Sequence, residues 1–149
     1  LELILVDGFN HYNKELHTKV HYDPLIEVFD AEDIEIIYND SWYSQIGSTV
    51  LCHPMAFSSG ILKTSEKALR YFQDIGLDFD SLVMSHVHRV GSYSVGKYNL
   101  YEQGCCCDTS KMEYADGKLT TPQREGFIVV YQDKDGKLIE SKTHIVRLN

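Results

Sequence analysis

Short blocks of hydrophobic residues alternate with polar residues along most of the chain. Blocks of roughly four to eight apolar and β-branched residues, bounded by glycine, asparagine or aspartate, are typical of β-strands. The predicted strands are residues 2–6, 34–38, 42–46, 49–52, 81–84, 91–95, 98–102, 126–131 and 138–146. Gly47-Ser48 predicts a hairpin turn between the third and fourth of these strands, and residues 133–136 predict a turn between the last two.

Residues 58–75 have the periodicity of an amphipathic helix. Apolar residues recur there every three or four positions, which places them on one face. They are Ile61, Leu62, Ala68, Leu69 and Phe72. Gly76 is suited to end this helix. Weaker helical patterns occur at residues 13–20 and after Asp23-Pro24.

The composition is that of one globular domain. A chain of 149 residues, of which 43% are hydrophobic and 24% charged, can bury one sizeable core. No repeat or linker-like tract divides it, so residues 1–149 are predicted to form a single unit. A helix between strands, followed by a run of antiparallel strands, predicts a layered α/β fold. No apolar run reaches the roughly 20 residues of a membrane-spanning helix, and the first residues are too acidic for a signal peptide, so no membrane partner is expected.

The formal net charge is −8, from 14 basic and 22 acidic side chains. Lysine and arginine are scattered singly, whereas a sequence-independent nucleic-acid binder presents a basic stripe. The charge pattern therefore argues against a large nucleic-acid-binding surface. Nucleic acid is expected only as a substrate, because bound divalent cations can supply positive charge locally.

The four cysteines are Cys52 and the run Cys105-Cys106-Cys107. Adjacent cysteines rarely build a disulfide framework, and no CxxC zinc spacing occurs. We therefore expect reduced, structural thiols and a cytoplasmic setting. In an extended run, the three side chains would alternate between opposite faces. A thiolate metal site at this run is the alternative.

Two histidines directly follow the predicted strand at residues 81–84. His86 and His88 flank Val87, and at this spacing both side chains would leave an extended backbone on the same face. Two imidazoles held in this way can bind neighbouring metal ions. The alternative is a pair of polar residues at a solvated strand end.

Two further strand ends carry histidine. His53 follows the strand at residues 49–52, and Asn10-His11 follows the first strand. Taken singly, each is explained by a turn or by a solvent-facing side chain. Because α/β folds build their sites at strand ends, the recurrence predicts a metal site at which these side chains converge. The other histidines, interpreted as surface residues, are His17, His21 and His144.

These histidines occur in the order of a known family. The segment SHVHR at residues 85–89 resembles the Gly-His-x-His motif of calcineurin-like metallophosphoesterases. His53 resembles the isolated histidine of that family, and GFNH at residues 8–11 resembles its Gly-Asn-His-Asp/Glu motif. Residues 101–105 and 126–130 also resemble phage and bacterial members. The resemblance thus covers nearly the whole chain, and its specificity comes from the ordered set of motifs.

The resemblance implies a fold and a site. The fold would be half of a four-layer αββα sandwich, with a mixed sheet and flanking helices. Asn10, His53 and His86 would be ligands of one metal ion, and His88 would be a ligand of the second. His11 would be the general acid that protonates the leaving oxygen, or a stabiliser of the transition state. Nitrogen and oxygen ligands suit Mn²⁺, the first expectation, and also Fe or Zn²⁺.

The chain departs from the family pattern at several positions. Phe9 is inserted, Tyr12 replaces a carboxylate, and Ser85 replaces the glycine of the histidine motif. The Asp-x-His and Gly-Asp-x-x-Asp motifs of the family are absent from the sequence. The resemblance therefore implies a carboxyl-terminal part, completed by a second chain that carries both motifs. We expect the strand at residues 3–6 and the histidine-bearing strands to pair with strands of that second chain.

The function that follows is that of a subunit or fragment of a binuclear metal-dependent phosphatase or phosphodiesterase. It would hydrolyse phosphomonoesters or phosphodiesters after completion by the missing part. A non-catalytic remnant, retained as an assembly subunit, is the alternative. A third interpretation is a small metal-binding domain that acts by itself.

Overall fold

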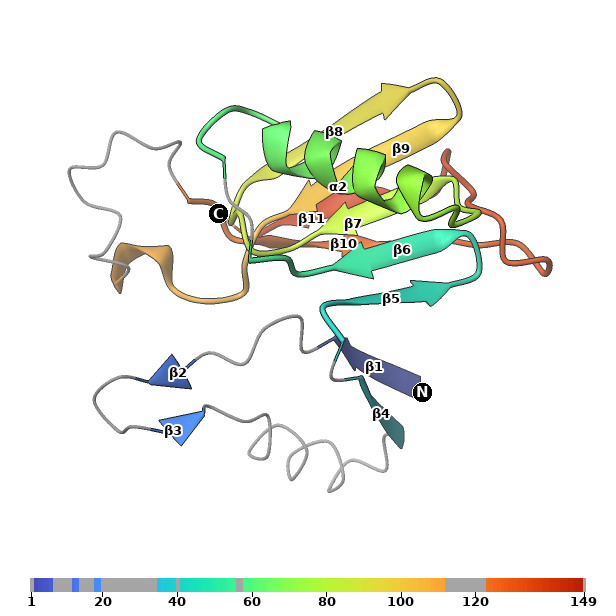
Figure 1. The fold of residues 1–149 in the computed structure, drawn as a ribbon. Coiled ribbons are helices and arrows are strands. Elements are labelled where there is room, and N and C mark those ends of the chain that lie inside the picture. The colour runs from blue at the N-terminus through green and yellow to red at the C-terminus, as the bar shows by residue number, and fades with distance from the viewer. Residues whose placement is uncertain are drawn as a thin grey trace.

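A mixed five-stranded sheet lies at the centre of the structure (Figure 1). This computed structural model describes residues 2–6, 12–13, 18–19, 35–39, 41–55, 58–111 and 123–148. The strands of the sheet are β5 (Tyr43–Ile46), β6 (Thr49–Cys52), β7 (Ser81–Met84), β8 (Val90–Val95) and β9 (Tyr98–Gln103). Their order is β5-β6-β7-β9-β8, with β6, β7 and β9 parallel and the two edge strands antiparallel to their neighbours. All five predicted strands are confirmed to within one residue at each end.

Helix α2 (Lys63–Asp74) connects β6 to β7 and covers one face of the sheet (Figure 1). Its buried side chains include Ala68, Leu69 and Phe72, three of the residues predicted to face the core. They pack against residues that alternate along the strands, because every second side chain of a strand points to the same face. These strand residues are Val50, Cys52, Leu82, Met84 and Leu100. The hydrophobic core therefore lies between the helix and the three parallel strands.

The helix begins later than the predicted position at residue 58. Leu62 has a φ of 58°, in the left-handed region, so the α-helix cannot extend backward through it. The backbone N–H of Ser58 donates to the Thr64 hydroxyl at 3.0 Å, which holds residues 58–62 as a loop across the helix start. Ile61, predicted to face the core, lies in this loop with 74% of its surface exposed.

A second, two-stranded sheet lies against the opposite face. It pairs β10 (Gly126–Val129) with β11 (His144–Arg147), and these strands contact β9 and β8. The segment between β10 and β11 also forms hydrogen bonds with the turn that joins β5 to β6. Gln132 donates to the Ile46 carbonyl at 2.6 Å, and Ser48 donates its backbone N–H to the Gly136 carbonyl at 2.7 Å.

The predicted strand over residues 138–146 is wrong in its first half. The N–H groups of Lys142 and Thr143 both donate to the Ile139 carbonyl, so residues 139–143 form a turn. Only the last part of the segment, β11, pairs with β10. The predicted turn at residues 133–136 is confirmed, because the Gly136 N–H donates to the Asp133 carbonyl at 3.0 Å.

The first forty residues contribute two small sheets within the described ranges. Strand β1 (Glu2–Val6) pairs in parallel with β4 (Glu35–Asn39), and β2 (Tyr12–Asn13) pairs with β3 (Thr18–Lys19). The strands predicted at residues 2–6 and 34–38 are thereby confirmed, the second shifted by one residue. The helical pattern predicted over residues 13–20 is wrong at the paired positions. Tyr12 and Thr18 are of types that favour strands, which agrees with this pairing. The helix expected after Asp23-Pro24 lies outside the described residues.

The α/β class is confirmed, with a five-stranded mixed sheet and a covering helix. One expectation about assembly is wrong: both histidine-bearing strands, β6 and β7, are inner strands that pair on both edges with strands of this chain. Among the described residues, no helix is both long enough and apolar enough to cross a membrane.

Candidate functional site

The carboxyl ends of β6 and β7 bring two histidines together. These strands are parallel neighbours whose last residues, Cys52 and Met84, are paired in register. His53 and His86 follow at the same edge of the sheet, and their ring centroids lie 5.2 Å apart with an angle of 84° between the rings. Both side chains are half-buried. The predicted convergence of these two side chains is confirmed, whereas their role as metal ligands stays a prediction.

The backbone that carries His86 and His88 is not extended, so the reason given for their common direction is wrong. The Val87 N–H donates to the Ser85 carbonyl at 2.8 Å, and His86 between them has a φ of 72°. This is the rare form of γ-turn. His88 also has a positive φ, of 49°. Such conformations cost roughly 1–3 kcal/mol each for a residue with a side chain, and they persist only where the surrounding structure enforces them.

Several contacts enforce this turn at residues 85–88. Val87 is 5% exposed and packs into the hydrophobic core. The Ser85 N–H donates to the Cys52 carbonyl at 3.0 Å, and the Ser85 hydroxyl accepts from Gln103 at 2.7 Å. At the other end, the His88 carbonyl accepts from the backbone N–H of Arg124 at 2.9 Å. The turn is therefore held by β6, by β9 and by the segment that leads into β10.

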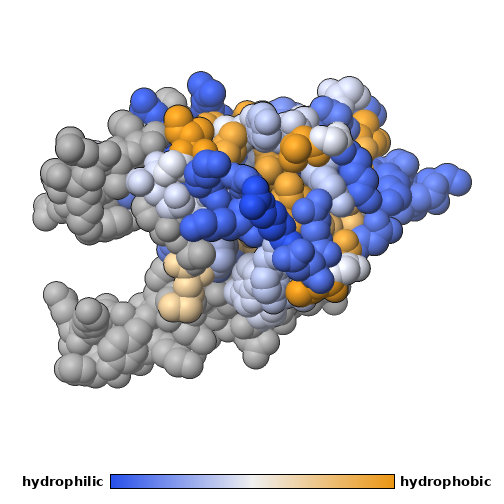
Figure 2. Space-filling view, turned by 45° about the horizontal axis from the view of Figure 1, so that its top comes forward, coloured by the Kyte–Doolittle hydropathy of each residue, from blue (hydrophilic) through white to orange (hydrophobic). Residues whose placement is uncertain are grey.

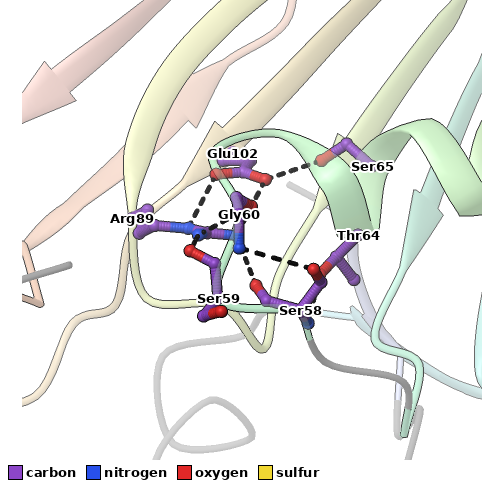
Figure 3. Close-up of polar contacts among 7 residues, drawn as sticks. All are labelled: Ser58, Ser59, Gly60, Thr64, Ser65, Arg89 and Glu102. Atoms are coloured by element: carbon purple, nitrogen blue, oxygen red, sulfur yellow. Dashed lines mark hydrogen bonds and ion pairs between the residues drawn. The ribbon is translucent and has the colours of Figure 1, made fainter. Parts of the chain in front are cut away.

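A buried ion pair follows the turn. Arg89 and Glu102 are 5% and 2% exposed, and Arg89 Nε lies 3.1 Å from Glu102 Oε2. The same guanidinium reaches backbone carbonyls that precede α2, and Glu102 accepts a hydrogen bond from Ser65 at 2.9 Å (Figure 3). The role of this pair was not predicted from the sequence. The available signal was a carboxylate near the end of an otherwise uncharged strand, because such a group is rarely buried without a partner.

Two of the five predicted site residues, Asn10 and His11, lie outside the described residues, as do His17 and His21. His144, interpreted as a surface residue, is exposed on β11 and stacks on Tyr131 with a centroid distance of 6.3 Å.

The described residues do not form a complete cluster of metal-ligating side chains. In the described ranges, no group of three or more histidine, cysteine, aspartate or glutamate side chains could hold an ion. A catalytic metal needs about three protein ligands, and His53 with His86 supplies two nitrogen donors. The described side chains at the strand ends therefore supply fewer ligands than a catalytic metal needs.

The cysteine run is not extended as predicted. None of the four cysteines forms a disulfide. Cys105 forms an isolated bridge to Glu125, whereas Cys106 and Cys107 lie exposed in a bend, so the three side chains do not alternate along a strand.

An apolar groove of about 680 Å³ lies between α2 and the β8–β9 hairpin. Figure 2 shows hydrophobic residues, in orange, on the face that carries α2, interspersed with hydrophilic ones. The described residues that line the groove include no histidine or cysteine, and the one carboxylate among them, Glu66, is paired with Lys63 and Arg70. The described lining of the groove therefore lacks the histidine side chains found at the ends of β6 and β7.

No protein-family model matches the chain, and the comparisons with curated proteins and with solved structures likewise gave no match.

Proposed function

We propose that this chain is part of a metal-dependent phosphoester hydrolase of the calcineurin-like type. The observation that carries the proposal is the convergence of His53 and His86 at the ends of two parallel strands joined by a helix. Imidazole nitrogen is a common ligand of Mn²⁺, Fe and Zn²⁺ in proteins. A positive-φ turn at His86 adds support, because strained backbone clusters at functional sites.

The layer order is also compatible with the proposed family. A helix, a five-stranded sheet and a two-stranded sheet follow one another in the described part of the chain (Figure 1). Half of a four-layer αββα sandwich would present its layers in this sequence. The remaining strands and the outer helix layer would come from the completing part.

In the proposed site, His53, His86 and Asn10 bind one divalent metal ion, and His88 binds a second. When bound, two such ions supply a hydroxide nucleophile and neutralise phosphoryl charge. His11 donates a proton to the leaving oxygen, a role that contributes roughly 10²–10⁴-fold to the rate. The missing carboxylates are supplied by a second chain with Asp-x-His and Gly-Asp-x-x-Asp motifs. The substrate is a phosphomonoester or a phosphodiester.

A second function, that of a non-catalytic assembly subunit, is favoured by one observation. The described residues contain no group of three metal-ligating side chains of the usual types. In this alternative, the histidines at the strand ends are structural and bind no ion.

Substitution of the two converging histidines separates these functions. For the metal site, we expect His53→Ala and His86→Ala to weaken Mn²⁺ or Zn²⁺ binding by at least about tenfold, since each removes a ligand. His144→Ala is the matched control, because His144 is an exposed histidine on β11. Calorimetric titration of the full chain gives the affinities, and hydrolysis of a p-nitrophenyl phosphodiester with the completing chain present gives the activity.

The His11→Ala variant distinguishes a proton donor from a ligand. It should keep the metal affinity and slow hydrolysis. Equal metal affinity in the wild type, His86→Ala and His144→Ala would overturn the metal site and favour the assembly subunit. Loss of metal from His11→Ala but not from His86→Ala would overturn the assigned roles.

A further inference from the structure

Arg89 links the segment that carries His86 to residues 58–60, which precede α2. It follows His88 directly, and its guanidinium is buried against residues 58–60, in the connection from His53 to α2 (Figure 3). Nη1 donates to the carbonyls of Ser59 and Gly60 at 3.3 and 3.1 Å. Nη2 donates to the Ser58 carbonyl at 3.4 Å. One side chain therefore holds three consecutive carbonyls of that connection.

Glu102 fixes the orientation of this guanidinium from β9. Its Oε1 accepts from Arg89 Nη2 at 3.4 Å, and its Oε2 lies 3.1 Å from Nε. Ser65, in the first turn of α2, donates to the same carboxylate at 2.9 Å. The amino-terminal end of a helix also favours a negative charge. Each buried charge is thus compensated by polar contacts. The pair is connected to the sheet through β9 and to helix α2 through Ser65.

Gln103, the residue after Glu102 in β9, contacts the other end of the segment 85–89, at Ser85. Gln103 donates to the Ser85 hydroxyl at 2.7 Å, and Glu102 binds Arg89. Because successive strand residues point to opposite faces, β9 contacts the segment 85–89 through side chains on both of its faces. His86 and His88, with their positive φ angles, lie between these two contacts.

We propose that Arg89 and Glu102 are positioning residues for the histidine pair. They hold the segment 85–89 against residues 58–60, so that the imidazoles of His53 and His86 keep their edge-to-face arrangement before any ligand binds. An apolar pair could fill the same buried volume with comparable stability. It could not bind three carbonyls and a carboxylate at once, which requires the planar fork of arginine. This inference rests on the proposed function only where its test measures metal affinity; the contact between the two imidazoles is independent of that function.

The test uses the full chain and compares three variants with the wild type. The double variant Arg89→Met with Glu102→Leu removes both charges and keeps apolar volume. Arg89→Lys keeps the charge beside Glu102 and so preserves the fold if the double variant does not fold, but its ammonium cannot span the three carbonyls. The matched control is Thr49→Val with Ser81→Ala, which removes the buried 2.7 Å hydroxyl pair at the other end of β6 and β7.

The first readout is the nuclear Overhauser effect between the imidazole protons of His53 and His86 without metal. We expect it in the wild type and in the control, and we expect it to be lost in the double variant and weakened in Arg89→Lys. Zn²⁺ affinity should fall about 10- to 100-fold in the same variants. An unchanged imidazole contact in a folded double variant, or in Arg89→Lys, would overturn the positioning role. If the wild type shows the contact but binds no Zn²⁺, the proposed function fails, and loss of the contact in the variants still supports the positioning role.

Discussion

Cys52 connects the hydrophobic core to the candidate site, because it ends β6 immediately before His53. It is 2% exposed, and its Sγ lies 3.9 Å from Met84 Sδ on the neighbouring strand. Burial raises the pKa of the Cys52 thiol far above its ordinary range. The thiolate is therefore excluded from the folded chain, so Cys52 acts as a small hydrophobic residue.

The raised pKa of Cys52 predicts a loss of stability at high pH. The folded state keeps the proton of this thiol, whereas the unfolded state releases it above about pH 8.5. Cys52 therefore contributes its full stability below that pH, and the free energy of unfolding falls by about 1.4 kcal/mol per pH unit above it. Urea unfolding followed from about pH 7 to pH 10 should therefore show, above about pH 8.5, a slope steeper by this amount in the wild type and in Cys106→Ala than in Cys52→Val. The same slope in Cys52→Val would contradict the assignment.

Two glycine turns meet where the β5–β6 hairpin contacts the segment before β11. Gly47 has a φ of 55°, and a Cβ added there would overlap the Gly136 carbonyl oxygen. Only glycine combines the left-handed conformation with so close an approach of backbone to backbone. The contact fixes the two-stranded sheet to the five-stranded sheet, since Ser48 donates to the same carbonyl.

Substitution of Gly47 should therefore lower the free energy of unfolding much more than substitution of a turn glycine with open space around it. Gly47→Ala introduces backbone strain that costs about 1–2 kcal/mol and steric overlap that costs about 1–3 kcal/mol. Gly96→Ala is the matched control: its φ is 58°, and nothing lies within 4 Å of an added Cβ. Chemical denaturation should show the larger loss of unfolding free energy for Gly47→Ala. Equal losses would mean that the two turns do not contact each other.

The elements that the sequence predicted well are those decided by local pattern. The short hydrophobic blocks placed β6 and β7, and the strand ends predicted that His53 and His86 converge. The errors depend on contacts between distant residues. Arg89 and Thr64 hold residues 58–60 as a loop, so the helix starts late, and no periodicity within the helix shows this. The γ-turn at His86 is likewise enforced from β6 and β9.

On the scale of the whole molecule, the five-stranded sheet and the β1–β4 pair differ in the support that the described residues give them. Helix α2 covers one face of the five-stranded sheet, and β10 and β11 lie against the other (Figure 1). In contrast, β1 and β4 form a parallel pair, and no further strand joins them in the described part of the chain. Parallel sheets normally have more strands and covered faces, and a two-stranded sheet is marginally stable by itself.

Hydrogen exchange should expose this difference. In the purified chain, we expect the amides of β1 to exchange at least about a hundredfold faster than those of β7, because β7 is paired on both edges. The β10–β11 pair is the internal control. It is also two-stranded but contacts β8 and β9, so its amides should exchange more slowly than those of β1. Addition of the proposed second chain should slow exchange in β1 and leave β7 unchanged, since only the open pair gains a neighbouring strand. If β1 is already as protected as β7 in the purified chain, then β1 and β4 are completed within this chain, and the second chain is not needed to finish the sheet.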